Sequence, residues 1–324
     1  MTVPVIDSIA RKYPQHELTF VSRPFVAPLF ARMPSNVRCV GVDVKRYPGL
    51  RGLYRLYREL AKERYDAVAD LHDVLRTKVL RTLFRCSGVR VAAIDKGRKE
   101  KKALVEKRIG SLEPLKSSFQ RYAEVFLRLG LEAGDDFRSI FGTGKGEISS
   151  LTSVVGEKGE DRWIGIAPFA AHRGKILPER TMEALLGLLP AYKVFLFGGG
   201  KAEAEKLEQW AARYPNVVSL AGKLKMAEEL ALMSRLEVMV SMDSANMHLA
   251  SLVGTPVVSV WGATHPSAGF MGWRQSVENA VQKDLDCRPC SIYGNKPCVR
   301  GDYACLEQIS PEDILERINR IAQP

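Results

Sequence analysis

The chain has 324 residues, of which 46% are hydrophobic and 26% are charged. This length has room for two domains of ordinary size, and the composition is that of a globular protein rather than a disordered or fibrous one. No run of about 18 apolar residues occurs, which argues against a membrane-spanning helix. The segment Met1–Asp7 does not combine a basic region with an apolar one. We therefore predict no signal peptide and expect a cytoplasmic protein.

The net charge of +11 is concentrated in the first half of the chain. Residues 1–150 contain 29 Lys and Arg against 17 Asp and Glu, a net charge of +12, and the remaining residues have 19 against 20, a net charge of −1. This asymmetry predicts an anionic partner for the first half, namely a phosphorylated lipid, a membrane surface or nucleic acid. For any single Lys or Arg, a solubilising surface charge is the simpler interpretation.

The first half alternates between predicted helices and strands. Helices are predicted over residues 1–13, 49–64 and 73–85, and strands over residues 18–21 and 67–71. Basic side chains recur at helical spacing along the second of these helices: Arg51, Arg55, Arg58 and Lys62. A stretch rich in Gly and Ser, residues 142–150, predicts a linker and a domain boundary near residue 150.

The second half alternates more regularly. The predicted strands cover residues 163–167, 192–197, 217–220, 238–240 and 257–260. The predicted helices cover residues 179–189, 202–214 and 227–234, with a last helix after Ser310 and Pro311. This order indicates an α/β fold in which helices cover both faces of a parallel sheet. Ligands of such sheets bind outside the carboxyl ends of the strands, where Gly198 and Asp243 are expected.

Asp243 and Ser244 stand at a predicted junction between a strand and a helix. Their side-chain oxygens can cap the helix. Free N–H groups at a helix start, together with the positive end of the helix dipole, form a site for an anion such as a diphosphate. His248 follows about one helical turn later. The alternative is an ordinary capped helix with a structural histidine.

The sequence from Asp243 to Thr264 resembles the signature D-[ST]-G-x-x-H…P-x-x-x-x-[FYW]-G-x-T of glycosyltransferase family 9, the heptosyltransferases of lipopolysaccharide core assembly. The matching residues are Asp243, Ser244, His248, Pro256, Trp261, Gly262 and Thr264. Ala245 replaces the family's Gly, and its methyl group narrows the approach of the backbone to a phosphate. The resemblance implies the GT-B architecture, in which two Rossmann-like domains face each other across a cleft. Residues 1–150 would form the acceptor-side domain and residues 151–324 the donor-binding domain.

Two more segments resemble donor-binding parts of this family. Residues 167–178 end like the family's K-x-[WL]-P loop, which implies that Lys175 reaches the donor phosphates. A Lys charge there would stabilise a departing nucleoside diphosphate without a metal, although a solvated surface Lys is the alternative. Residues 198–203 resemble the G-G-x-x-E turn, which implies that Glu203 holds ribose hydroxyls. A dinucleotide-binding G-x-G-x-x-G fingerprint fails because residue 203 is not Gly.

On the acceptor side, residues 65–72 resemble the family's Y-D-x-x-x-D strand and loop, and residues 118–131 resemble its R-Y…L-G-L helix. The acceptor-side candidates are Asp70, His72, Arg98, Lys101 and Arg121. Their surroundings are basic, which suits an anionic lipopolysaccharide-core acceptor and peripheral contact with the inner membrane. For most of these charges singly, a solvated face remains the simpler interpretation.

Six cysteines occur in two groups. Cys39 and Cys86 are isolated and are predicted to be buried small hydrophobic residues. The other four form a cluster near the end of the chain: Cys287, Cys290, Cys298 and Cys305. Their spacing could hold a structural zinc, and free thiols are an equal alternative. No cofactor is expected for catalysis.

The resemblance also bears on the start of the chain. Members of the family open with a strand and a Gly-Asp turn, and the Asp of that turn is the expected general base. This chain begins within the helix that would follow, so we expect the first strand and the catalytic Asp to lie upstream of Met1. Asp7 lies inside that helix and is not expected to replace the base. We therefore expect this polypeptide to bind a donor but to turn over poorly.

The sequence thus predicts an inverting, metal-independent transferase that moves heptose from ADP-heptose to a lipopolysaccharide inner-core acceptor, at the cytoplasmic face of the inner membrane. Three alternatives stay open: a transferase of another nucleotide sugar, a nucleotide-sugar epimerase and a non-catalytic sugar-nucleotide binder. A nucleic-acid-binding module is disfavoured, because the basic runs lack interleaved aromatic residues for base stacking.

Overall fold

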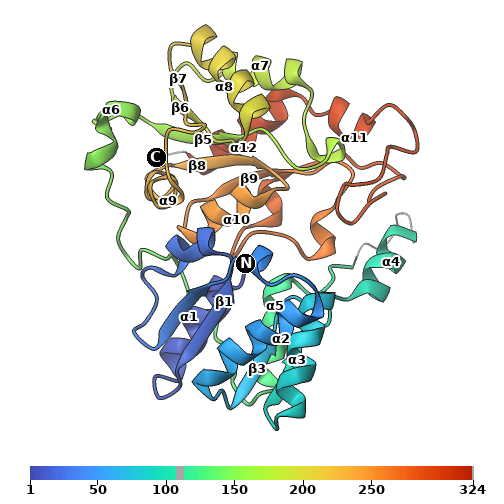
Figure 1. The fold of residues 1–324 in the computed structure, drawn as a ribbon. Helices are drawn as coiled ribbons and strands as arrows, with labels where there is room; N and C mark the ends of the chain where they lie inside the picture. The colour runs from blue at the N-terminus through green and yellow to red at the C-terminus, as the bar shows by residue number, and fades with distance from the viewer. Residues whose placement is uncertain (107–112, 323–324) are drawn as a thin grey trace. The chain divides into compact units, whose positions relative to one another are not determined.

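The computed structural model describes residues 1–106 and 113–322. Contacts divide the chain into two units (Figure 1). The first unit consists of Met1–Arg98 and Lys116–Ile140, and the second of Lys99–Leu115 and Phe141–Pro324. Residues 99–106, 113–115 and 141–150, which the sequence analysis places in the first domain, therefore pack with the second unit.

The second unit contains a six-stranded sheet with the order β10-β9-β8-β5-β6-β7. Every neighbouring pair in it is parallel. The strands are β5 (Trp163–Ala167), β6 (Lys193–Leu196), β7 (Val217–Ser219), β8 (Val238–Met242), β9 (Val257–Val260) and β10 (Ala280–Val281). Five of the six strands were predicted from the sequence. The central strand β5 is buried along its whole length, as expected for a strand covered on both faces.

Helices cover both faces of this sheet. The helices α7 (Glu179–Gly187), α8 (Lys201–Arg213) and α12 (Pro311–Ile321) lie on one face, and α9 (Met226–Met233) and α10 (Ala245–Leu252) lie on the other (Figure 1). Two shorter helices are α6 (Thr152–Val155) and α11 (Ala304–Glu307). Side chains of α7, α8, α12 and the strands form one buried apolar cluster, which stabilises the packing of these helices on the sheet.

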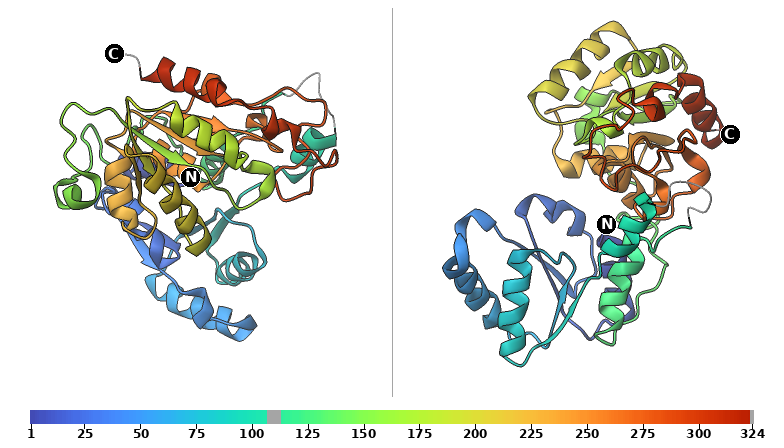
Figure 2. Two further views of the ribbon diagram at one scale, coloured as in Figure 1. Left: turned by 90° about the horizontal axis from the view of Figure 1, so that it is seen from above. Right: turned by 90° about the vertical axis from the view of Figure 1, so that its right-hand side faces the viewer.

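The first unit contains two pairs of parallel strands. The pairs are β1 (Leu18–Ser22) with β2 (Val37–Gly41), and β3 (Ala67–Asp70) with β4 (Arg90–Ala93). The helices are α1 (Val3–Lys12), α2 (Gly49–Leu60), α3 (Leu75–Cys86) and α5 (Ser118–Leu127), and α4 (Arg98–Glu106) begins where the chain passes to the second unit. In the right-hand view of Figure 2, α2 and α3 lie on one side of these strands and α5 lies on the other.

Short 3-10 helices complete the described secondary structure. They are η1 (Pro24–Phe30), η2 (Val44–Arg46), η3 (Ala61–Glu63), η4 (Ser149–Leu151), η5 (Arg173–Lys175), η6 (Pro266–Ala268) and η7 (Val277–Asn279). The Gly- and Ser-rich stretch ahead of η4 packs closely on the second unit: the Gly146 N–H donates to Ser234 Oγ at 2.8 Å, and Arg235 Nε donates to the Gly146 carbonyl at 2.8 Å. None of the described helices is both long and apolar enough to cross a bilayer.

Candidate functional site

The predicted donor-binding segments follow β5, β6 and β8. Because these strands are parallel neighbours, their carboxyl ends lie at one edge of the sheet. At this edge, Lys175 Nζ lies 2.9 Å from Asp243 Oδ2, and only 15% and 6% of the two side chains are exposed. The structure therefore joins two residues, 68 positions apart in the sequence, that the resemblance assigns to the donor phosphates. Burial makes this ion pair stronger than one in water, and it makes the loss of either partner costly.

The amino terminus of α10 adjoins this ion pair. Ser244 is the N-cap residue, as predicted, but its side chain makes no capping hydrogen bond. Its Oγ instead lies 3.3 Å from Ser241 Oγ. The first N–H groups of α10 thus have no side-chain cap, and such groups are the ones that bind an anion. Ala245, the departure from the family signature, is exposed at the first position of the helix.

His248 lies one turn into α10. Burial, together with neighbouring positive charges that include Lys175, lowers the pKa of His248 from 6.5 to about 3. The imidazole is therefore neutral at physiological pH. Near a diphosphate, His248 would contribute a hydrogen bond and not a charge, which leaves Lys175 and the helix terminus as the sources of positive potential.

The position of Lys175 depends on two glycines that the sequence analysis did not select. The Gly174 carbonyl accepts a hydrogen bond of 2.8 Å from the Ala263 N–H, which ties the loop after β5 to the loop after β9. Gly294 has a φ of +73°, and a Cβ built there would lie 2.7 Å from Lys175 Cγ. The aliphatic part of Lys175 thus lies against the backbone of the cysteine-rich segment, where only Gly leaves room for it.

Arg288 is the main support of the loop after β9, and it was also missed. Its guanidinium donates to the carbonyls of Gly262 (2.5 Å), Trp261 (3.1 Å), Thr264 (2.8 Å) and Lys283 (2.5 Å), and to Gln282 Oε1 (3.0 Å). The residue is only 3% exposed. Burial lowers the pKa of Arg288, although an arginine remains charged at neutral pH. A position beside the cysteines gives no sequence signal for this role.

We expect Arg288→Met to lower the free energy of unfolding by about 3 kcal/mol, because several buried carbonyl groups lose their donor at once. Urea denaturation measures this change. The matched control is Arg300→Met in the same segment, where an exposed Arg pairs with Asp302. That exposed pair is screened by water and contributes little to stability. Equal losses in the two variants would show that Arg288 has no special structural role.

His265 makes the stability of the second unit depend on pH. Its Nδ1 accepts a hydrogen bond of 3.1 Å from the Ser267 N–H, which requires an unprotonated Nδ1. Burial, and then the charge of Arg288, lower the pKa of His265 from 6.5 to about 4. Between these pH values the unfolded chain binds a proton that the folded chain does not, so the free energy of unfolding falls as the pH is lowered.

We therefore expect His265→Gln to be less sensitive to acid than the wild type. Above pH 6.5 the imidazole is neutral in both states and has no effect of this kind, whereas the penalty grows below 6.5 and is complete near 4. Urea denaturation of both proteins across this window measures the two slopes. Parallel slopes would contradict the assignment of this titration to His265.

Glu203 lies at the start of α8, after β6. Its Oε2 accepts a hydrogen bond of 2.8 Å from the Gly199 N–H. The carboxylate therefore closes the glycine turn at the same edge of the sheet as Lys175. Its predicted contact with a ribose stays a prediction, and it would use the other carboxylate oxygen.

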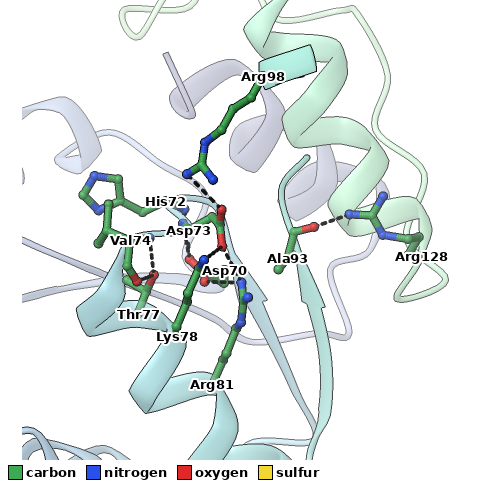
Figure 3. Close-up of polar contacts among 10 residues, drawn as sticks. All are labelled: Asp70, His72, Asp73, Val74, Thr77, Lys78, Arg81, Ala93, Arg98 and Arg128. Carbon is green, nitrogen blue, oxygen red and sulfur yellow. Dashed lines mark hydrogen bonds and ion pairs between the residues drawn. The ribbon is translucent and has the colours of Figure 1, made fainter. Parts of the chain in front are cut away.

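Among the predicted acceptor-side residues, Asp70 is the centre of the turn after β3 (Figure 3). Asp70 Oδ1 accepts the N–H groups of His72 (3.0 Å) and Asp73 (2.9 Å), and its Oδ2 pairs with Arg81 at 2.9 Å. His72 is exposed on this turn. Asp70 thus has a structural function whatever it does for a substrate, because its buried carboxylate fixes the turn that presents His72.

Asp73 lies on the same turn, and its carboxylate contacts three basic side chains. Its carboxylate lies 3.0 Å from Arg81, 3.8 Å from Lys78 and 3.4 Å from the predicted acceptor residue Arg98 (Figure 3). Burial acts to raise the pKa of Asp73, but these three charges together hold that pKa below its usual value. Asp73 therefore stays ionised and orients Arg98, a role that the sequence analysis did not assign.

The other two acceptor-side candidates have separate surroundings. Lys101 packs in the second unit, where it is buried and its Nζ lies 4.4 Å from the centre of the Phe270 ring. Arg121 is buried on α5, and its Nη1 donates to the Asp95 carbonyl at 3.3 Å. The contacts of Asp70 and Asp73 join Asp70, His72 and Arg98 into one group.

The six cysteines are free thiols. Within residues 1–106 and 113–322, no group of His, Cys, Asp or Glu is arranged to hold a metal, and this range includes the four clustered cysteines. The structural zinc that their spacing allowed is therefore not shown, and it stays a prediction. Burial raises the pKa of Cys305 to about 11, so its thiol is protonated. Cys86 is exposed, and the prediction that it is buried is wrong because it lies on the outer side of α3.

A parallel α/β unit with a lysine and an uncapped helix terminus at the carboxyl edge of its sheet has the features of a nucleotide-binding protein. The model of the family described as "Glycosyltransferase family 9 (heptosyltransferase)" matches residues 53–298. The chain therefore belongs to this family, as the sequence resemblance indicated.

Named relatives agree with this assignment. Lipopolysaccharide heptosyltransferase 3 of Escherichia coli is 23% identical over 87% of this chain and 84% of its own length. The structure of ADP-heptose lps heptosyltransferase II of E. coli superposes with a TM-score of 0.70 at 18% identity and covers 99% of this chain and 94% of that one. A family 9 glycosyltransferase of Veillonella parvula gives a TM-score of 0.74 at 19% identity, with 99% and 92% covered. These similarities confirm the predicted GT-B fold class.

Proposed function

We propose that this protein transfers heptose from ADP-heptose to the core of lipopolysaccharide. Membership of family 9 carries this proposal, since the family match covers residues 53–298 and the named relatives are heptosyltransferases. The chain aligns with most of the length of these relatives. We place its work at the cytoplasmic face of the inner membrane, where a nucleotide-activated donor and a lipid-linked acceptor would meet.

In the proposed reaction, the acceptor hydroxyl displaces the nucleoside diphosphate at the anomeric carbon with inversion. Negative charge then develops on the leaving diphosphate. Lys175 and the N–H groups at the start of α10 would stabilise that charge, because they are already in place before the reaction. His248 is neutral and would orient the diphosphate by a hydrogen bond, and Glu203 would hold the ribose.

The acceptor would be recognised by the charged turn after β3. Arg98 is 65% exposed and is oriented by Asp73, which leaves part of its guanidinium available to an anionic group of the acceptor. We assign no general base. Asp7 is bound by Arg11 through both carboxylate oxygens, at 2.8 and 3.1 Å, and this pairing does not favour a role in proton transfer.

The decisive experiment compares donors. We expect calorimetry to give tighter binding of ADP than of UDP, GDP or NAD, and we expect ADP-heptose to donate to a heptose-deficient core acceptor. Preference for UDP or GDP would keep the transferase and change the sugar. Conversion of a free nucleotide sugar without an acceptor would favour an epimerase, and binding without any turnover would favour a non-catalytic binder.

A further inference from the structure

The helix α2 has an unusual outer surface. Its inner side is apolar, since Gly52, Leu53 and Leu56 are buried against the first unit. Its outer side carries two large apolar residues, because Leu50 is 72% exposed and Tyr54 is 52% exposed. Exposed apolar side chains of this size on neighbouring turns of one helix indicate a surface that meets something less polar than water.

Basic side chains surround these two residues. We define the outer face of α2 as six residues, the last of which lies in η3 directly after the helix: Leu50, Arg51, Tyr54, Arg55, Arg58 and Lys62. All six are exposed, and four of them are cations. Arg55 is fixed in place, because it donates to the Arg46 carbonyl and its guanidinium lies 5.2 Å from the centre of the Tyr47 ring. Arg51 lies one turn before Tyr54 along the helix, and Arg58 lies one turn after it.

Nearby acidic groups neutralise only part of this positive charge. Glu59, on the same helix, accepts a hydrogen bond from the Tyr47 hydroxyl and lies 4.0 Å from Arg55. Glu63 pairs with Arg38 at 2.9 Å. The outer face therefore keeps a positive excess, in agreement with the net charge of the first half of the sequence.

This combination matches the surface of an anionic bilayer. Arg and Lys bind lipid phosphates while their aliphatic stems lie along the apolar boundary. Tyr favours the headgroup region because its ring is apolar and its hydroxyl is polar. A short helix parallel to the membrane can insert a few apolar side chains without spanning it.

We propose that the outer face of α2 docks the protein on an anionic lipid bilayer, with Leu50 and Tyr54 inserted at the boundary and the four basic side chains bound to headgroups. Only the role of this docking rests on the proposed function: it would hold the enzyme at the membrane that contains its acceptor. The docking itself needs no turnover and can be measured without it.

The first test is co-sedimentation with vesicles made of phosphatidylglycerol and phosphatidylcholine in equal amounts. We expect the wild type to bind these vesicles and to bind pure phosphatidylcholine weakly. The double variant Arg51→Gln/Arg58→Gln should bind about 25-fold less tightly, since each basic side chain near an anionic surface contributes about fivefold. The double variant Leu50→Ser/Tyr54→Ser should bind the anionic vesicles about tenfold less tightly than the wild type. This loss should persist at high salt, where headgroup attraction is screened.

The matched control removes two exposed lysines of the second unit, Lys201→Gln/Lys296→Gln. It lowers the net charge by the same amount and should leave vesicle binding within about twofold of the wild type. The proposal is overturned if the wild type does not bind anionic vesicles, or if this control weakens vesicle binding as much as Arg51→Gln/Arg58→Gln does. Circular dichroism confirms that all variants are folded.

A second test separates the bilayer from the acceptor itself. With a deacylated, water-soluble core acceptor, Arg51→Gln/Arg58→Gln should keep the wild-type kcat/KM, and with the same core embedded in vesicles it should lose activity in proportion to membrane binding. Equal loss on both acceptors would show that the face binds the core sugars or their phosphates, and would overturn the proposal. If the enzyme transfers heptose to neither acceptor, the proposed function fails. Vesicle binding then still tests the docking proposal on its own.

Discussion

Replacing Lys175 by Ala will weaken the binding of ADP by about 100-fold, because a charge-assisted contact to a phosphate at a desolvated site contributes about 3 kcal/mol. The same change leaves the Asp243 carboxylate buried without its partner, so the free energy of unfolding should also fall by about 3 kcal/mol. Calorimetry measures the first effect and urea denaturation the second. Lys175→Arg should keep part of the binding, since it retains the charge.

A double variant separates these two roles. Lys175→Met/Asp243→Asn removes both charges, and the loss of stability should be smaller than the sum of the single losses, because no uncompensated charge remains buried. Binding of ADP should nevertheless stay weak. If the double variant recovered both stability and ADP binding, Lys175 would be a structural residue that does not contact the phosphates.

Replacing Asp70 by Ala will destabilise the protein by about 3 kcal/mol and will raise the KM for the acceptor. The carboxylate satisfies two backbone N–H groups of the turn and pairs with Arg81, so its removal leaves the two N–H groups without their acceptor and Arg81 with Asp73 as its remaining carboxylate partner. The turn presents His72 and positions Asp73 beside Arg98. We therefore expect the KM for the donor to change less than the KM for the acceptor.

The comparison for Asp70 is Asp66→Asn, at an exposed position just before β3. This change alters a carboxylate on the same segment without touching the turn, and its effect on stability should lie within about 0.5 kcal/mol. The loss of stability of Asp70→Asn should lie between those of Asp66→Asn and Asp70→Ala. Its amide keeps one oxygen as an acceptor but places an NH2 group toward another donor. A larger increase in the donor KM than in the acceptor KM would contradict the assignment of this turn to the acceptor.

The sequence was most informative where local patterns and burial agree. In the second unit, continuous apolar runs such as β5 are bounded by Gly or polar residues, and the parallel sheet follows from their alternation with amphipathic helices. Strand β2, with the sequence V-R-C-V-G, and strand β4, with R-V-A-A, were not predicted. Both are short and contain an Arg, and their strand conformation depends on pairing with β1 and β3 rather than on an alternating pattern of their own.

The site shows the same division. Strand ends and the resemblance placed Lys175 and Asp243 at one edge of the sheet, and the structure joins them. Arg288, Gly294 and Asp73 could not be found in this way. Each acts by contacts with residues distant in sequence or by a backbone conformation, and single residue types give no signal for either. Lys101 was grouped with the acceptor side by its position in a basic run, whereas its contact partner Phe270 is a residue that only the tertiary fold reveals.

The chain passes between its two units three times, after Arg98, after Leu115 and after Ile140. No single cut can therefore separate the units as complete pieces. A fragment that begins at Phe141 lacks the Leu115 N–H that the Ser267 carbonyl accepts at 2.9 Å, and it also lacks Lys101 against Phe270. A fragment that ends at Ile140 carries those residues with nothing to pack on. Each half, expressed alone, would expose surface that the intact chain buries. Expression and refolding experiments therefore need the two units in one chain.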